Sequence, residues 1–372
     1  MAEARKRRND FMDKGQCAAL AAICVVAFLP YFILRADLVG ADSYYFASAV
    51  CGKVQLQDQP PLAMLLFSLM PCSIPLFKLF LFSLMLCAVF GIAQLGNLFS
   101  RNGWLAGLFA FLSPLLVYEF AKFENDAVAF AIVPWILYFF YRGTLENKVK
   151  YEVAALALAV FAASFWFGAA YYAIAMALSS IVALMVAVPM LVLKGRELII
   201  AVLPNLNVFE NMPFIGIIYL FILPMGFATV PMVMIWQFMF FYVLLLINAK
   251  FSIHIIPFLA VGFMLVIERF PRMITIMAIM SFTMAFVWGT MLLHQPPTPE
   301  HWDAIDYAIC LDKNVTNSWG LGYWVLWRGG IPSAWGGGHW EQDYSGKVVV
   351  VQEELLGCEQ LNDSNNARVY RC

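Results

Sequence analysis

Phe123-Glu124-Asn125-Asp126 is the stretch that decides the fold, because it places two carboxylates between two long apolar runs. The run 104–118 precedes it, and the run 127–141 follows it. A carboxylate at the centre of a bilayer costs about 2.5–3.5 kcal/mol, so such groups lie at the membrane surface or in a cavity lined by protein. We therefore expect this stretch to join two membrane helices at one surface of the membrane.

The composition is that of a polytopic α-helical membrane protein. Of the 372 residues, 63% are hydrophobic and 13% are charged, whereas only about half of the residues of a soluble domain are apolar. A basic cluster, Arg5 to Arg8 with Lys14, precedes the first apolar run at 16–34 and predicts a cytoplasmic N-terminus. That run is too long for the core of a signal peptide, so we expect a retained membrane helix.

The apolar runs of residues 1–293 predict a membrane domain of about nine to eleven helices. We expect a re-entrant or interfacial piece at 60–74 and a crossing at 104–118. Residues 151–193 are long enough for two crossings. One crossing with a re-entrant part, or a third passage that is completed at 198–206, also agrees with the sequence.

Residues 294–372 have a different character and predict a small extracytoplasmic α/β domain. Three prolines begin this part of the chain, and polar sequence rich in Trp and Gly follows. The valine-rich run 347–352 predicts a β-strand. Cys358 and Cys372 flank a turn-rich segment, so we expect a disulfide between them in an oxidising exterior.

Acidic residues from three parts of the chain lie on the external side in this topology. They are Asp42, the pair Glu124 and Asp126, and Glu210. The pair brackets one residue, so both carboxylates can converge on a hard divalent cation, which takes oxygen ligands. Alternatively, the pair caps the following helix, because acidic groups are stabilised near a helix N-terminus. The other two carboxylates, arriving on the same side, favour the cation.

These acidic residues belong to a series of short motifs. In chain order the motifs are Asp42-Ser43-Tyr44-Tyr45, Phe123-Glu124-Asn125-Asp126 with Pro134 after it, Gly195-Arg196, Val208-Phe209-Glu210-Asn211-Met212-Pro213, Lys250-Phe251, and Trp319 with Gly322-Tyr323-Trp324. The series resembles the catalytic subunit of oligosaccharyltransferase, a membrane glycosyltransferase of the GT-C class that uses sugars linked to lipid phosphates. The resemblance implies a GT-C-like membrane domain at 1–293 and a soluble domain at 294–372.

The resemblance also implies a catalytic centre. Asp42 and Glu210 would be catalytic, and together with Glu124 and Asp126 they would hold Mg²⁺ or Mn²⁺. Such a set suits transfer from a polyprenyl phosphate, which needs positive charge at the leaving phosphate and a carboxylate that is free to activate the acceptor.

Two further sets of residues take their roles from the same resemblance. Arg196 and Lys250 would hold the donor phosphate as fixed positive charges. The acceptor side would be formed by Trp319, Gly322, Tyr323 and Trp324. Ser318 and Gly320 stand where the family has a Trp and an Asp that grip the acceptor hydroxyl. We therefore expect weaker recognition of Asn-x-Ser/Thr sites.

The sequence thus predicts a membrane glycosyltransferase that moves a sugar or oligosaccharide from a polyprenyl (di)phosphate to an acceptor outside the cytoplasm. The expected partners are the lipid-linked sugar, membrane lipid and a protein or glycan acceptor, and we expect no nucleic acid. A GT-C transferase that acts on a lipid or glycan is an alternative. A non-catalytic protein that binds lipid-linked sugars, or a transporter-like membrane protein, is another.

Overall fold

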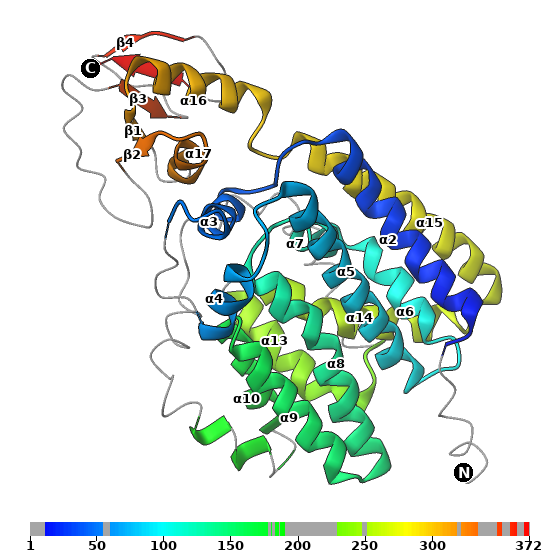
Figure 1. Ribbon diagram of the computed structural model, residues 1–372. Coiled ribbons are helices and arrows are strands. Elements are labelled where there is room, and N and C mark those ends of the chain that lie inside the picture. Colours follow the sequence, from blue (N-terminus) through cyan, green and yellow to red (C-terminus); the bar gives the residue numbers. More distant parts are fainter. Residues whose placement is uncertain are drawn as a thin grey trace.

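The protein is a bundle of helices with a small sheet at one end (Figure 1). The computed structural model describes residues 12–54, 60–177, 180, 183–185, 187–189, 229–247, 251–317, 321–333, 348–351, 358–362 and 368–371. The first helix, α2, and the last long one, α15, lie side by side along one edge of the bundle (Figure 1).

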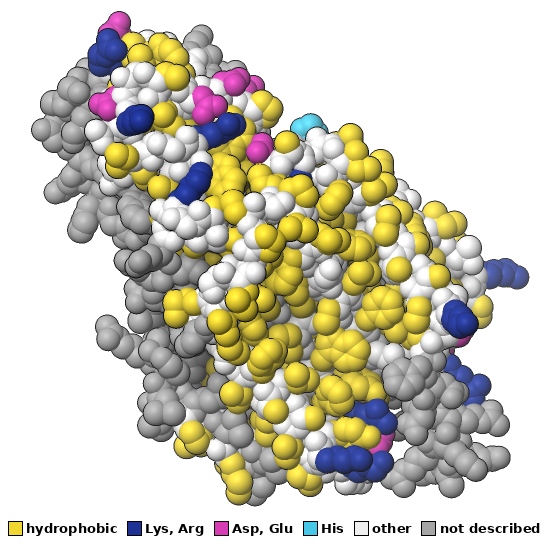
Figure 2. Space-filling view, viewed as in Figure 1, with side chains coloured by type: hydrophobic (Ala, Val, Ile, Leu, Met, Phe, Trp, Pro, Cys, Tyr) yellow, Lys and Arg dark blue, Asp and Glu magenta, His cyan; other side chains and the backbone are white. Residues whose placement is uncertain are grey.

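Among the described residues, four helices are long and apolar enough to cross a membrane. They are α2 (Lys14–Leu34), α5 (Ile74–Asn97), α8 (Asn125–Glu146) and α15 (Pro271–Met291), the last within the longer segment Pro271–Leu311. In Figure 2 hydrophobic side chains cover the middle of the bundle, and charged ones gather towards its two ends. This distribution is the one expected of a protein whose middle faces lipid.

Shorter helices complete the bundle. They are α3 (Ala41–Val50), α4 (Pro61–Ser68), α6 (Trp104–Phe109), α7 (Pro114–Glu119), α9 (Val149–Ala163), α10 (Ala170–Ala177), α13 (Ile235–Ile247) and α14 (Ser252–Ile267). The 3-10 turns η1 (Ala110–Leu112), η2 (Phe167–Ala169), η4 (Met232–Met234) and η6 (Leu292–His294) link or extend them. With only 8 residues, α4 is too short to cross a bilayer, as we expected for 60–74.

The expected crossing at 104–118 is not formed by one continuous helix, and whether this segment crosses the membrane stays a prediction. The segment is divided into α6, a 3-10 turn and α7, and the break lies at Ser113 and Pro114. Proline has no N–H for the helix ladder, and it disfavours the helical conformation in the residue before it. Ser113 is accordingly extended, with φ −95° and ψ 125°.

The number of crossings between 151 and 210 stays open, because much of that stretch lies outside the described residues. The part that is described contains α9 and α10, and α9 packs along α8. The predicted count of nine to eleven membrane helices therefore stays a prediction.

The C-terminal part contains a small sheet, and the predicted strand at 347–352 is present in it as β3. Its five described strands are β1 (Asn314–Asn317), β2 (Ile331–Pro332), β3 (Val348–Val351), β4 (Glu359–Gln360) and β5 (Arg368–Arg371), and their spatial order is β2-β1-β3-β5-β4. Strand β1 runs parallel to its neighbours, whereas β5 is antiparallel to both of its own. Helix α16 (Pro299–Leu311) packs on the sheet, and α17 (Gly322–Trp327) packs against α3. The domain boundary at residue 294 stays a prediction.

Arg35, at the end of α2, ties the first helix to the segment that leaves α15. Its guanidinium donates hydrogen bonds to the carbonyl oxygens of Leu292, Gln295 and Pro297 at 2.6, 2.7 and 2.8 Å. The N–H of Gly40 donates to the carbonyl of Pro296 at 3.1 Å. These contacts fix the chain between the membrane helices and the sheet, so they fix where α16 and α17 lie.

Disulfides stabilise two loops of the described structure. Cys51 and Cys72 are bonded, with Cα atoms 4.9 Å apart, and this bond joins the end of α3 to the start of α5. We did not predict it, because Cys72 borders an apolar segment in which a thiol is usually a small hydrophobic group. Cys358 is also disulfide-bonded. Its predicted partner, Cys372, lies outside the described residues.

Candidate functional site

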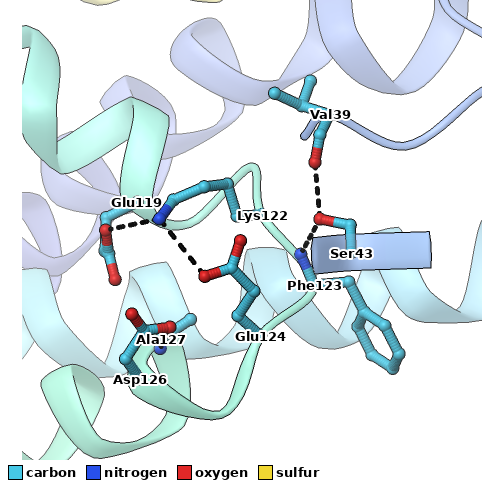
Figure 3. Close-up of polar contacts among 8 residues, drawn as sticks. All are labelled: Val39, Ser43, Glu119, Lys122, Phe123, Glu124, Asp126 and Ala127. Atoms are coloured by element: carbon cyan, nitrogen blue, oxygen red, sulfur yellow. Dashed lines mark hydrogen bonds and ion pairs between the residues drawn. The ribbon is translucent and has the colours of Figure 1, made fainter. Parts of the chain in front are cut away.

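A pair of hydrogen bonds brings the first acidic motif against the second (Figure 3). The backbone N–H of Phe123 donates to the hydroxyl oxygen of Ser43 at 2.8 Å, and that hydroxyl donates to the carbonyl of Val39. Val39 also forms a parallel bridge with Lys122. Ser43 and Phe123, which are 80 positions apart, are thus joined by a hydrogen bond between a side chain and a backbone, and Asp42 and Glu124 are their immediate neighbours in sequence.

The ring of Phe123 anchors this junction in the bundle. The ring is fully buried and stacks on Phe77, with centroids 4.4 Å apart and planes 19° apart. It also makes an edge contact with Phe67 at 5.1 Å. The sequence folds this way because an aromatic side chain next to a charged loop gains apolar contact in the core while its neighbours stay at the bundle end.

Lys122 is the cation of the site, and the sequence interpretation missed it. Its ammonium nitrogen lies 3.4 Å from Glu119 Oε2 and 3.3 Å from Glu124 Oε2 (Figure 3). Burial alone lowers the pKa of Lys122, but the carboxylates of Glu119, Glu124 and Asp126 outweigh burial and hold that pKa above its ordinary value. The available signal in the sequence was the position of Lys122, three residues after Glu119 and two residues before Glu124.

Glu124 lies in a strongly charged and buried environment. Burial raises the pKa of its carboxyl well above the ordinary value; Lys122 opposes the rise, whereas the carboxylates of Asp126 and Asp42 add to it. Asp42 therefore acts on Glu124 across the junction of the two loops. The structure brings three of the four predicted carboxylates into one electrostatic neighbourhood.

The alternative role of the acidic pair, capping of the following helix, suits Asp126 better than it suits Glu124. Glu124 is the N-cap residue of α8, but its side chain makes no capping hydrogen bond. Asp126 lies in the first turn, and its Oδ1 accepts a hydrogen bond from the N–H of Ala127 at 3.1 Å. An acidic group there is stabilised by the helix dipole, whatever else it does.

Helix α17 brings part of the predicted acceptor side to this site. The ring of Tyr323 packs on Tyr45, with centroids 5.0 Å apart, and the Asp42 carboxylate interacts electrostatically with the Tyr323 hydroxyl. Burial raises the pKa of Tyr323, and the Asp42 charge adds to the rise. The site therefore lies between the membrane helices and the C-terminal part, with α3 in the middle (Figure 1).

The other predicted acceptor residues in the structure are structural neighbours of that contact. Gly322 begins α17, and the buried indole of Trp324 packs against the rings of Trp302 and His301, 6.2 and 5.1 Å away. Trp302 in turn donates a hydrogen bond from its indole N–H to Asp37 at 2.8 Å. Trp324 thus holds α17 to α16.

Several predicted site residues lie outside the described part of the chain. They are Glu210, Arg196, Lys250 and Trp319. The structure consequently does not test their predicted roles.

His254, on α14, lies near Asp126 inside a group of aromatic rings. It is 2% exposed, its ring stacks on Trp166 with centroids 5.3 Å apart, and its Nδ1 is 2.7 Å from the hydroxyl of Tyr172. Asp126 interacts with it electrostatically. No described group forms a hydrogen bond with its Nε2.

The predicted divalent cation does not fit the described residues as they are arranged. In the described part of the chain, no three His, Cys, Asp or Glu side chains come together in a group able to hold a metal ion. An ammonium group already pairs with Glu124, which is one of the predicted ligands. Mg²⁺ or Mn²⁺ at this site stays a prediction.

Comparisons with known proteins add no assignment. No protein-family model matches the chain, and no curated protein matches it.

Proposed function

We propose that this protein is a membrane glycosyltransferase that moves a sugar or oligosaccharide from a polyprenyl (di)phosphate donor to an acceptor outside the cytoplasm. One observation carries the proposal. Asp42 and the Glu124/Asp126 pair, which are separated by about 80 residues of chain, share one electrostatic neighbourhood at an end of an apolar helical bundle. A lipid-linked sugar presents its phosphate at that level of the membrane.

The arrangement suits a transfer reaction. The bond between the anomeric carbon and the phosphate oxygen breaks, and the polyprenyl (di)phosphate leaves with the electron pair. The anomeric carbon bonds to the acceptor, whose proton passes to a carboxylate that acts as general base. Asp42 is our candidate for that base, because its carboxylate interacts electrostatically both with Glu124 and with Tyr323 of α17. Glu210 is the second candidate.

The GT-C-like fold and the orientation in the membrane are part of the same proposal. The basic residues before α2 favour a cytoplasmic N-terminus. A disulfide forms in an oxidising compartment, so the Cys51–Cys72 bond supports an external position for the loop with Asp42. The C-terminal part, with Cys358 in a disulfide, is external in this orientation.

The test is transfer by the purified chain in detergent or lipid. The donors are synthetic polyprenyl-phosphate and polyprenyl-diphosphate sugars, and peptide, lipid and glycan acceptors are offered together. We expect a glycosylated product by mass spectrometry. Asp42→Asn should lower the rate at least about 100-fold, the lower range of general acid–base catalysis. The matched control Glu359→Gln, an exposed residue of β4, should leave the rate unchanged.

Two outcomes would contradict the proposal. Equal rates in wild type, Asp42→Asn and Glu210→Gln would leave the mechanism without its general base. Absence of transfer from every donor, with donor lipid still bound, would favour the alternative of a non-catalytic protein that binds lipid-linked sugars. The product would also decide between a protein acceptor and a lipid or glycan acceptor.

A further inference from the structure

The carboxylate site already contains a positive charge that is supplied by the chain. Lys122 Nζ lies 3.4 Å from Glu119 Oε2 and 3.3 Å from Glu124 Oε2, so it bridges two carboxylates (Figure 3). The three side chains are only 14%, 14% and 11% exposed. Ion pairs at that degree of burial are screened much less than pairs on an open surface.

Packing holds the Lys122 side chain in this position. Its backbone forms the bridge to Val39, and its stem lies against Gly40, where an added Cβ would be 3.7 Å from Lys122 Cγ. Gly40 has φ +83°, a conformation that favours glycine. On another side the ring of Tyr118 lies 5.5 Å from the ammonium nitrogen, within the range of a cation–π contact. The backbone and the packing therefore hold the Lys122 ammonium in the site, and it is not a freely moving surface charge.

A divalent metal ion and this ammonium compete for the same carboxylate. Mg²⁺ binds oxygen at about 2.0–2.1 Å, so an ion on Glu124 Oε2 would lie within about 5.4 Å of Lys122 Nζ, which is 3.3 Å from that oxygen. Two positive centres at that distance in a partly buried site repel each other strongly. Either the metal ion is excluded or Lys122 has to leave a position that backbone and packing both fix.

We propose that Lys122 supplies the permanent positive charge beside Glu119 and Glu124, and that the site therefore works without a bound divalent metal ion. The role of the site in this inference rests on the proposed function. The way in which the charge of the site is balanced does not depend on that function. Lys122 is a positioning residue in this role, because it acts through the carboxylates that it holds.

Metal binding by the full-length chain in detergent tests the proposal directly. The purified protein is treated with chelator, and Mn²⁺ alone is titrated while free Mn²⁺ is followed by electron paramagnetic resonance. We expect no binding to wild type that depends on Glu124. Stoichiometric binding to wild type that is lost in Glu124→Gln would overturn the proposal.

The Lys122→Met variant tests whether the lysine is the reason why the site binds no divalent metal ion. Once the ammonium is gone, Mn²⁺ should bind roughly tenfold more tightly or better than it does to wild type, and added Mn²⁺ should raise the melting temperature of the variant. Lys122→Arg, which keeps the charge, should behave like wild type. A folded Lys122→Met variant that gains no Mn²⁺ binding would refute the role of Lys122. If this variant does not fold, the double variant Lys122→Met/Glu119→Gln takes its place, because it has one carboxylate fewer without a partner. The double variant is titrated with Mn²⁺ in the same way.

Sugar transfer in the presence of EDTA separates the two proposals. Transfer that EDTA abolishes and Mn²⁺ restores would refute the metal-free site and leave the glycosyltransferase intact. Transfer that survives EDTA supports both. If no transfer occurs under any condition, the proposed function fails, and the Mn²⁺ titrations still decide how the charge is balanced.

Discussion

The hydroxyl oxygen of Ser43 accepts a hydrogen bond from the backbone N–H of Phe123, with the two atoms 2.8 Å apart. Both residues are fully buried, and this bond is one link between the start of α3, which carries Asp42, and the segment before α8, which carries Glu124. The position of Asp42 relative to Glu124 therefore depends on a side chain that has no chemistry of its own in the reaction.

Ser43→Ala should destabilise the protein by about 1–3 kcal/mol, because it leaves the buried N–H of Phe123 without its partner. Chemical denaturation in detergent measures the change. Ser83→Ala is the matched control, since the Ser83 hydroxyl only bonds to a carbonyl of its own helix on an exposed face. A loss that is the same for both variants would contradict the linking role of Ser43.

Glu124 should make the stability depend on pH. Its folded-state pKa is raised above the unfolded value by burial and by the charges of Asp126 and Asp42, against the opposing charge of Lys122. Folding therefore takes up a proton, and the stabilisation is complete below the ordinary glutamate pKa of about 4.3 and is lost as pH rises through the raised value. The stability of wild type minus that of Glu124→Gln should fall as pH rises. A difference that grows with pH would show that the carboxylate is stabilised as an ion instead.

Tyr172→Phe should cost roughly 1–3 kcal/mol of stability, because it removes the hydrogen-bond partner of a buried imidazole nitrogen. No described group bonds to the other ring nitrogen of His254, so the variant ring would have neither partner within the described structure. Thermal unfolding followed by near-ultraviolet circular dichroism suits this measurement, since Trp166 stacks on the same ring. Tyr307→Phe is the control, because Tyr307 is 42% exposed on α16. Equal losses in the two variants would argue against a special role for the His254 contact.

The acceptor should not be selected by the Asn-x-Ser/Thr rule. Gly320 offers no carboxylate for the acceptor hydroxyl, and Ser318 offers no indole. A site built to hydrogen-bond a hydroxyl discriminates by about 10⁴–10⁵-fold, and a site without that partner loses this means of selection. Transfer to peptides that differ only in Thr or Ala two residues after Asn should proceed at similar rates. Strong dependence on the Thr that is lost in Trp319→Ala would contradict this expectation.

The long apolar runs predicted the helices well, because hydrophobic length is a local property of the sequence. The ends of α2 and α8 lie within five residues of the ends of the apolar runs 16–34 and 127–141. The break at Pro114 was also visible in the sequence, but we gave the apolar composition more weight than the missing N–H. The crossings after residue 177 could not be settled, because length and charge there agree with several topologies.

The charge pattern of the site was harder to predict. Asp42, Glu124 and Asp126 were identified from their residue types and order, and the structure places them in one electrostatic neighbourhood. Lys122 was missed because a lone basic residue in a loop usually indicates solvent exposure or the cytoplasmic side of a membrane. Its role depends on Glu119 and on a backbone bridge to Val39, which a local sequence pattern cannot predict.

The three hydrogen bonds from Arg35 to the chain at 292–297 have a consequence for biosynthesis. The residues that they join are more than 250 positions apart, so these three hydrogen bonds cannot form until the last long helix has been made. Until then, the segment that leads from α2 to Asp42 also lacks the hydrogen bond from the Gly40 N–H to the Pro296 carbonyl. A ribosome that stops before residue 292 would leave a chain with its apolar helices made but without these contacts, so Asp42 should be held less firmly in a truncated product.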